Sequence, residues 1–467
     1  MNVLLIQNDI RRKETDFNDL SPYVCVNLLA TVLKNAGHNV EILDPLKLQL
    51  FQKEQIKLID FIKQLITKHN IHLVGISVLL NTRIQAINIS EEIKRYTNNK
   101  VIIVLGGAGA SLLYEQILRK YHKIIDYIVI GEGEETFKEL VNNLGDDQVI
   151  NKLKGISYFK NKKVIVNPKR PQIKNLDNIP FPDYTHYFES TGLETMNTIN
   201  ISTTRGCPYH CSHCGTNALW GNIRFRSPQN VINEIKINYK KFHIKKVRFN
   251  DDSFGINRKQ SISILQNIIN EEIDIELYAH TRFDLINDEF MRLYKQAGGQ
   301  SLYLGLETAS ERIKKIMNRQ IPNDLIREKC KLLKQHNIKF GVFILFGYPE
   351  ETSDDIKQTY DLLKEIQPDD VYCSITKIQP RTELYNKAIE KGLINDETWF
   401  LDKREFFTFL TNNDQELLLK AFEIIFYEKF SHYDIRNICE KNNDLIDLDL
   451  NSNRFKKMKE KAISLLS

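Results

Sequence analysis

The sequence predicts an α/β protein in which a Rossmann-like, doubly wound parallel sheet precedes a partial, TIM-like barrel of six βα repeats and a small helical C-terminal region. Two observations predict this class. Apolar runs of strand length alternate with amphipathic helical segments, first to about residue 144 and again from about residue 196. In the first stretch these runs are continuously apolar, as in parallel strands that are covered on both faces. We expect a Rossmann-like domain at 1–150, a hairpin and linker at 151–195, the barrel at 196–395 and the helical region at 396–467.

Composition indicates an ordinary soluble protein. The chain has 467 residues, of which 42% are hydrophobic and 27% charged, enough for more than one core. Because no apolar run approaches about 18 residues and the first residues resemble a strand rather than a signal peptide, we expect a cytoplasmic protein. Seven cysteines, three of them clustered, favour a reducing compartment. The net charge of +5 is small and spread along the chain, so neither nucleic acid nor membrane is expected as a partner.

Five strands are expected in the first domain, at 3–7, 40–43, 73–78, 101–105 and 127–130, with helices at 26–34, 56–68 and 84–96. Small residues follow three of these strands, and in α/β sheets ligands bind at the carboxyl ends of strands. They are Ser77, Gly106 with Gly107, and Gly131 with Gly133. Glycines there let a bulky ligand approach the backbone, although each can also be a tight turn. The spacing does not match Gly-x-Gly-x-x-Gly, which disfavours a nicotinamide or flavin dinucleotide.

The connector and the barrel follow in order. Residues 155–166 read as a hairpin around Asn161-Lys162, and the two prolines of 178–183 read as an extended strap. Barrel strands are expected at 198–203, 246–250, 275–280, 300–305, 340–346 and 371–377, with helices such as 231–242 and 325–336 between them. Active-site residues in such barrels lie at the carboxyl ends of the strands.

A Cys-x3-Cys-x2-Cys motif, Cys207, Cys211 and Cys214, follows the first barrel strand. Three thiolates can hold one metal centre but fall one short of the four that bind an ordinary iron–sulfur cluster, which leaves an open position for chemistry. The alternative is a zinc site with His210 or His213 as the fourth ligand. Polar residues at the ends of later strands make a cofactor site the better interpretation.

The stretch 202–215, Ser-Thr-Thr-Arg-Gly-Cys-Pro-Tyr-His-Cys-Ser-His-Cys-Gly, resembles the radical S-adenosylmethionine enzymes. The resemblance implies that Cys207, Cys211 and Cys214 are the catalytic and metal-binding residues, and that they hold a [4Fe-4S] cluster whose fourth iron chelates S-adenosylmethionine. It also implies an external electron donor such as flavodoxin or ferredoxin. His213 departs from the family pattern, which has an aromatic residue there.

Three further segments, 249–254, 305–310 and 346–352, are similar to segments that contact S-adenosylmethionine in cobalamin-associated members of the family. The similarity implies that Asp252 faces the methionyl ammonium, Arg282 the carboxylate, and Glu307 the ribose or the ammonium. A zwitterionic ligand does need both signs of charge nearby.

The N-terminal domain resembles the cobalamin-binding domain that precedes many radical S-adenosylmethionine domains, in residues 35–44, 106–108 and 126–140. The resemblance implies cobalamin contacts from Ser77, Gly106, Gly107, Gly131, Glu132 and Gly133. The Asp-x-His-x-x-Gly motif, whose histidine ligates cobalt, does not occur. We therefore expect no protein imidazole on the cobalt.

Together these resemblances imply a cobalamin-dependent radical S-adenosylmethionine methyltransferase. It would act through a 5′-deoxyadenosyl radical on an unactivated carbon of a small-molecule or peptide substrate. The alternatives are a radical cyclase or oxidative rearrangement enzyme without methyl transfer, and a non-catalytic iron–sulfur or corrinoid sensor. The C-terminal region, clearest as an amphipathic helix at 416–430, contains no motif that names a substrate.

Overall fold

The computed structural model describes residues 1–8, 21–44, 57–191, 196–401 and 407–409, so the helix expected at 416–430 lies outside the described residues. The described chain forms two compact units, one of residues 1–206, 219–248 and 396–401, the other of residues 207–218, 249–395 and 407–409. No helix within these residues is long and apolar enough to cross a membrane.

The N-terminal sheet has seven strands in the order β2-β1-β3-β4-β5-β6-β7. Their bounds are β1 Asn2–Gln7, β2 Asn39–Leu43, β3 Leu73–Ser77, β4 Ile102–Gly106, β5 Tyr127–Val129, β6 Ile156–Lys160 and β7 Lys163–Val166. The first five pair in parallel, which confirms the predicted doubly wound sheet. The expected hairpin also forms, but it adds β6 and β7 antiparallel to the edge of this sheet instead of standing apart as a connector. Its turn residues Asn161 and Lys162 both have positive φ, 52° and 60°, as tight hairpin turns require.

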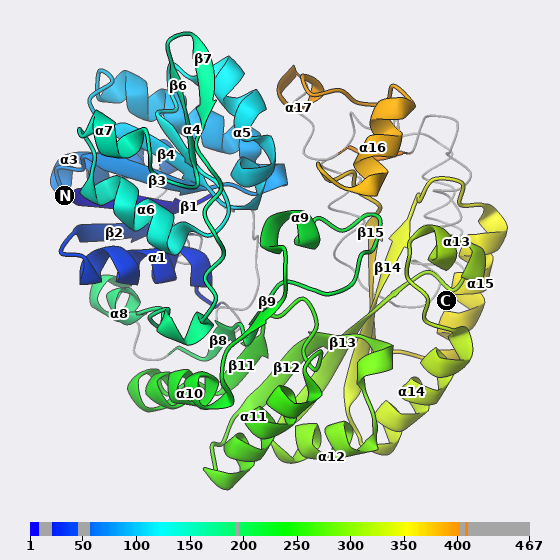
Figure 1. The fold of residues 1–467 in the computed structure, drawn as a ribbon. Coiled ribbons are helices and arrows are strands. Elements are labelled where there is room, and N and C mark those ends of the chain that lie inside the picture. Colours follow the sequence, from blue (N-terminus) through cyan, green and yellow to red (C-terminus); the bar gives the residue numbers. More distant parts are fainter. Residues whose placement is uncertain (9–20, 45–56, 192–195, 402–406, 410–467) are drawn as a thin grey trace. The chain divides into compact units, whose positions relative to one another are not determined.

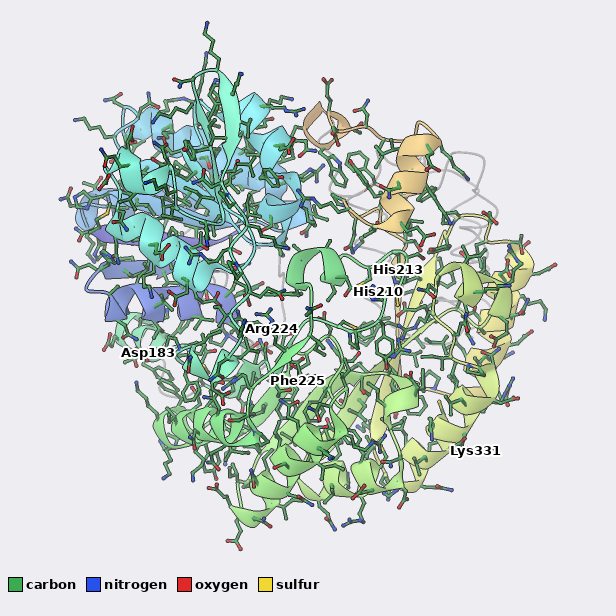
Figure 2. The ribbon with its side chains drawn as sticks, viewed as in Figure 1. Asp183, His210, His213, Arg224, Phe225 and Lys331 are labelled. Atoms are coloured by element: carbon green, nitrogen blue, oxygen red, sulfur yellow. The ribbon has the colours of Figure 1, made fainter. Side chains whose placement is uncertain are left out.

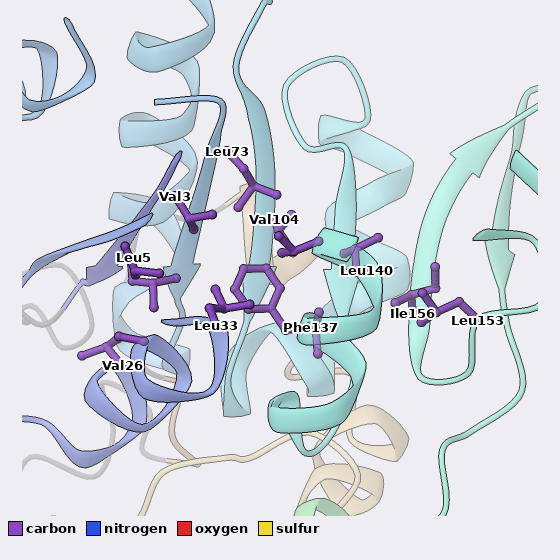
Figure 3. Packing of buried hydrophobic residues seen from close by; sticks show 14 of the residues in the cluster. Val3, Leu5, Val26, Leu33, Leu73, Val104, Phe137, Leu140, Leu153 and Ile156 are labelled. Carbon is purple, nitrogen blue, oxygen red and sulfur yellow. The ribbon is translucent and has the colours of Figure 1, made fainter. Parts of the chain in front are cut away.

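Helices cover both faces of this sheet (Figure 1). On one face are α1 (Val24–Asn35) and α6 (Gly133–Asn142); on the other are α3 (Leu58–Lys68), α4 (Arg83–Tyr96) and α5 (Ala108–Tyr121). Figure 3 shows Leu33 and Phe137 packed with Leu5 in the core between α1, α6 and the strands. A Cβ atom at Gly75 in β3 would lie 2.9 Å from Leu5 and 3.1 Å from Phe137, so this glycine makes room for the ring.

Further elements of this unit lie along the chain after β5. They are α7 (Asp147–Ile150), α8 (Thr185–Thr191), α10 (Pro228–Phe242), and the two-stranded ribbon of β9 (Thr204–Arg205) and β10 (Arg224–Phe225). Helix α10 begins three residues before the expected range of 231–242: the Ser227 side chain caps it by accepting a hydrogen bond from the Asn230 amide, and Pro228 occupies the first turn. α17 (Thr398–Leu401) also belongs to this unit.

The second sheet has six strands in the order β15-β14-β13-β12-β11-β8, which confirms the predicted partial barrel of six βα repeats. The strands are β8 Thr198–Ile201, β11 Lys246–Phe249, β12 Glu276–Thr281, β13 Gly299–Glu307, β14 Lys339–Phe346 and β15 Asp370–Ile375. Figure 1 shows α11 (Arg258–Asn270), α12 (Asp288–Gln296), α14 (Asn323–Gln335) and α15 (Ser353–Ile366) along one face of the sheet. This part of the chain also contains three short helices, α9 (Thr216–Trp220), α13 (Glu311–Ile316) and α16 (Glu383–Glu390).

Candidate functional site at the cysteine loop

The three cysteines lie on one loop, residues 207–214, between β9 and α9. The backbone turns into this loop at Gly206, whose φ of +93° favours glycine. All three thiols are half-buried and none forms a disulfide. Figure 2 shows His210 and His213 on the same loop.

The loop is seated on a segment that we call the docking segment, residues 316–319, which comprises the last residue of α13 and the three residues after it. The Ser212 amide donates to the Met317 carbonyl at 3.0 Å, and the Ser212 hydroxyl donates to the Ile316 carbonyl at 3.1 Å. The Asn318 side chain donates to the His210 carbonyl at 2.8 Å. These bonds fix the path of the backbone through the cysteines, so the spacing of the motif becomes a defined arrangement of thiols.

Electrostatic interactions between the thiols affect the pKa of Cys207 and of Cys214. Burial raises the pKa of Cys207 and of Cys214, and the neighbouring cysteines and Asp252 raise it further, against opposing hydrogen bonds from Tyr209 and Thr216. A bound cation would remove this repulsion, because metal binding replaces the thiol protons. Within the described ranges, no three His, Cys, Asp or Glu side chains are gathered around a single metal-ion position. Three thiols of one fixed loop do fit a cluster, in which each thiolate binds a different iron.

Asp252, which follows β11, is linked to the loop through Thr216 at the start of α9. The Cys214 thiol donates to the Thr216 hydroxyl, and that hydroxyl donates to Asp252, both at 3.3 Å. Burial raises the pKa of Asp252, while the bond from Thr216 lowers it, and the net direction is upward. Asp252 thus lies beside the cysteines, but the prediction that it faces a methionyl ammonium remains a prediction.

Arg282, which follows β12, is already paired. Its guanidinium makes a two-point ion pair with Asp284, at 2.9 and 3.0 Å, and its carbon centre lies 3.5 Å from the ring centroid of Tyr209 in the cysteine loop. The stacking braces Tyr209 between two cysteines. Any ligand carboxylate at Arg282 would therefore share it with Asp284, and its assignment to the carboxylate stays a prediction.

Glu307 ends β13 at an irregular position. The register with β14 shifts between Gly305 and Glu307, and Glu307 has a left-handed φ of +61°, a conformation that is strained for a residue with a side chain. Its carboxylate lies 3.8 Å from the guanidinium of Arg319, the last residue of the docking segment. Arg319 also donates to the Gly305 carbonyl at 2.6 Å and lies 3.9 Å from the sulfur of Cys211.

His213, the departure from the family pattern, keeps an aromatic contact. Its ring packs edge-on against Tyr348, with centroids 6.2 Å apart and planes at 85°. Burial lowers the pKa of His213, against the opposing charge of Glu307, so the imidazole is neutral near pH 7.

In the N-terminal unit, Ser77, Gly106 and Gly107 meet at the carboxyl ends of β3 and β4. Gly107 has a φ of +94°, and a Cβ atom there would lie 3.0 Å from the Val78 carbonyl oxygen and 3.4 Å from the Ser77 hydroxyl. Gly106 has room for a Cβ, with its nearest neighbour 3.9 Å away. The fold itself therefore requires glycine at position 107, and Gly107 is no evidence for a bound ligand. Gly106 has no such structural requirement.

Gly131 and Gly133 flank Glu132 after β5. Gly131 has a φ of +82°, and a Cβ built on it meets no described atom within 4 Å, whereas one on Gly133 would lie 3.2 Å from Leu29. Gly131 thus leaves open space at this edge of the sheet, as a cofactor would need. Gly133 begins α6 and serves helix packing.

Glu132 is fully engaged in an ion-pair network. Its carboxylate accepts hydrogen bonds from Arg205 at 2.8 Å, from Arg224 at 2.8 and 2.9 Å, and from the Ile173 amide at 2.9 Å. Arg205 also bonds Glu134 at 2.5 Å. Burial would raise the pKa of Glu132, but these hydrogen bonds hold it below its usual value. The side chain therefore fixes the loop, and contacts to a cofactor from here would come from the backbone.

Sequence reasoning assigned no role to several residues that build the site. These residues, which carried no individual signal, are Arg319, Tyr209, Thr216 and Arg205. Their roles depend on contacts between segments that are far apart in the chain; Cys211 and Arg319, for example, are 108 positions apart. Spacing within one segment cannot report such contacts.

Comparison with known proteins agrees with this geometry. The family model of the radical SAM superfamily matches residues 201–363, and that of the B12 binding domain matches residues 19–141. An uncharacterized methyltransferase of Pyrococcus horikoshii is 31% identical over 368 residues, 78% of this chain and 77% of the relative. The anaerobic magnesium-protoporphyrin IX monomethyl ester cyclase of Rubrivivax gelatinosus is 26% identical over 314 residues, 65% of this chain and 56% of the cyclase.

The same two-domain fold occurs in a solved structure. The radical S-adenosylmethionine methyltransferase TsrM from Kitasatospora setae, with cobalamin and a [4Fe-4S] cluster bound, superposes with a TM-score of 0.68 at 17% identity. The match covers 84% of this chain and 75% of that chain.

Proposed function

Because the chain belongs to the radical S-adenosylmethionine enzymes that carry an N-terminal cobalamin-binding domain, we propose that it methylates an unactivated carbon of a small molecule or peptide. Its cofactors are a [4Fe-4S] cluster, S-adenosylmethionine and cobalamin. When bound, the cluster supplies the electron that splits S-adenosylmethionine to a carbon radical, and cobalamin supplies the methyl group. The observation that carries the proposal is the three-thiol loop fixed on its docking segment, in a chain that also has a B12 binding domain.

The residues of the chain bind and orient. Cys207, Cys211 and Cys214 would hold three irons and leave the fourth open, and the docking segment keeps their positions. Asp252, Glu307 and Arg282 are the charges available to a zwitterionic ligand at the same ends of the strands. In the N-terminal domain, the open edge at Gly131 and the backbone of 131–133 would receive the corrin. We expect a low-potential donor such as a flavodoxin or ferredoxin to deliver the electron.

The proposal is tested by turnover of the reconstituted holoenzyme. We would supply S-adenosylmethionine with a deuterated methyl group, a chemical reductant, cobalamin and candidate substrates, and follow label by mass spectrometry. The expected result is one labelled methyl group in the product, with 5′-deoxyadenosine and S-adenosylhomocysteine in roughly equal amounts, because a methylase uses S-adenosylmethionine once as radical source and once as methyl donor. A product without label would contradict methyl transfer.

A second candidate, a radical cyclase, is favoured by the similarity to the cyclase of Rubrivivax gelatinosus. It predicts 5′-deoxyadenosine without matching S-adenosylhomocysteine, and a product that lacks the added methyl group. The same turnover experiment therefore separates the two candidates.

A further inference from the structure

The docking segment places a positive charge against the cluster ligands. We propose that Arg319 raises the reduction potential of the cluster held at Cys211, and that Glu307 opposes it; this rests on the proposed function only in requiring that the cluster binds. Arg319 is then a positioning and tuning residue, acting through the charge that it directs at one ligand sulfur.

Three contacts fix the guanidinium. One nitrogen donates to the Gly305 carbonyl at 2.6 Å and lies 3.8 Å from Glu307, and another lies 3.9 Å from the Cys211 sulfur. The side chain is only 10% exposed. Water and salt therefore screen its charge weakly. Because a guanidinium stays protonated at any accessible pH, this positive charge is permanent.

The sequence makes room for the guanidinium at Gly305. A Cβ atom at this position would lie 2.5 Å from an Arg319 nitrogen and 2.5 Å from a Glu307 oxygen. Any larger residue would push both charged groups away from their places. Gly305 lies in the interior of β13, where glycine otherwise weakens a strand, so its presence supports a demand from these side chains.

The backbone of the docking segment around Arg319 is also held in place. Lys314, which is 2% exposed, donates to the Ile321 carbonyl at 2.8 Å and so ties α13 to the turn that follows the docking segment. The Met317 carbonyl and the Asn318 side chain hold the cysteine loop itself. Arg319 thus approaches Cys211 from a segment that other bonds keep in place, which lets its charge be removed without undocking the loop.

The sign of the effect follows from charge. Reduction of the cluster adds one electron, taken from an external one-electron donor that is oxidised in the same step. The reduced form carries one more negative charge on the same ligand set. A nearby buried cation stabilises that form more than the oxidised form, and a nearby carboxylate does the opposite. Arg319 should therefore raise the potential, and Glu307 should lower it.

The test is a redox titration of the reconstituted protein without S-adenosylmethionine or substrate, with the reduced cluster read by paramagnetic resonance. At one fixed solution potential, Arg319→Met should lower the ratio of reduced to oxidised cluster at least tenfold, which is 59 mV for a one-electron couple. Arg319→Lys should lower it less, because the charge is kept but the planar contacts are lost. Glu307→Gln should raise the ratio.

Lys315→Gln is the matched control, because it removes an equal charge from an exposed position four residues away in the chain. Its ratio should stay within twofold of the parent protein. If Arg319→Met retains the cluster but also stays within twofold, the inference is wrong. If Arg319→Met does not load iron, Arg319→Gln decides instead. It removes the charge but keeps a side-chain N–H that can donate to the Gly305 carbonyl, and it should lower the ratio at least tenfold; no change there overturns the inference. A parent protein that binds no cluster would instead contradict the proposed function.

Discussion

The loop at Glu132 and the loop at Cys211 both rely on arginine, but in opposite ways. At Glu132, two guanidinium groups and a backbone amide surround one carboxylate, and a second carboxylate shares Arg205. At Cys211, Arg319 has its carboxylate partner no closer than 3.8 Å and faces a thiol. The first network closes on itself and stabilises a fold, whereas the second leaves charge directed at a ligand. Arginine thus closes an ion-pair network in one unit and, by our proposal, tunes a cluster in the other.

The largest expected effect is at the thiols. Replacing Cys207, Cys211 and Cys214 together by Ala should abolish binding of iron and sulfide and all cleavage of S-adenosylmethionine, because no other described cysteine lies in this loop. Iron and sulfide analysis after anaerobic reconstitution measures the first effect, and 5′-deoxyadenosine formation measures the second. Cys330→Ala is the control: this thiol is buried in α14, burial raises its pKa to about 12, and its loss should leave the cluster intact. A parent protein with one zinc and no sulfide would contradict the cluster.

Next in size is the Glu132 network. Glu132→Gln removes the charge that Arg205 and Arg224 share and leaves Arg224, whose side chain is 10% exposed, without its carboxylate partner. Breaking such a buried pair should lower the free energy of unfolding by about 3–5 kcal/mol. Urea denaturation of the apo-protein measures this. The matched control is Glu365→Gln at an exposed pair with Arg327, where about 0–1 kcal/mol is expected. Equal effects would show that the first network is no more structural than a surface pair.

Glu351 in the second unit tests what a buried carboxylate does without a close arginine. Burial raises its pKa to about 7, against hydrogen bonds from the Gly347 and Tyr348 amides and the charge of Arg312, while Asp355 adds to the rise. The folded state therefore holds a proton that the unfolded state releases near pH 4.5. Stability should fall as pH rises from 4.5 through 7, by at most about 3 kcal/mol.

Glu351→Gln keeps an acceptor for both amides but cannot ionise. Its unfolding free energy should lose this component of the pH dependence between pH 4.5 and 7. Asp355 supplies the contrast: burial would raise its pKa, but hydrogen bonds from Ser310, Thr352 and Arg312 hold it at about 2. Its contribution is present at neutral pH and is lost only in strong acid. A variant with the parent pH profile would contradict the assignment to Glu351.

The comparison also shows how far sequence reasoning reached. Alternation of strands and helices predicted both sheets. The continuously apolar strands of the first domain predicted parallel pairing, because such strands are buried on both faces. Sequence reasoning placed Asp252, Arg282 and Glu307 at strand ends, where the structure has them. It could not predict that Arg282 forms an ion pair with Asp284, or that Glu132 pairs with two arginines. Nor could it predict that Glu307 adopts a left-handed backbone conformation beside Arg319. The ion pairs of Glu132 join distant segments, and such tertiary contacts have no periodic signature. The pair of Arg282 with Asp284 is local, but a pattern of apolar residues does not report how charged side chains pair.

The smallest expected effect distinguishes a glycine that only the backbone conformation requires from one that also makes room for a ligand. Gly131 and Gly37 are alike in the structure: φ is +82° and +83°, and a Cβ on either meets no described atom within 4 Å. Gly131→Ala and Gly37→Ala should therefore cost the same in stability, about 1–2 kcal/mol for an alanine held in the left-handed region. Gly131 follows β5 at the carboxyl edge of the sheet, whereas Gly37 precedes β2 at the other edge.

If cobalamin lies on the carboxyl edge, only Gly131→Ala adds a methyl group against it. Titration with hydroxocobalamin, followed by visible absorption, should then show several-fold weaker binding for Gly131→Ala and parent affinity for Gly37→Ala. Equal affinities in both variants would move the corrin away from Gly131 without affecting the family assignment. Because the two substitutions share their strain and differ in their edge of the sheet, the difference in affinity reports the position of the ligand rather than the stability of the fold.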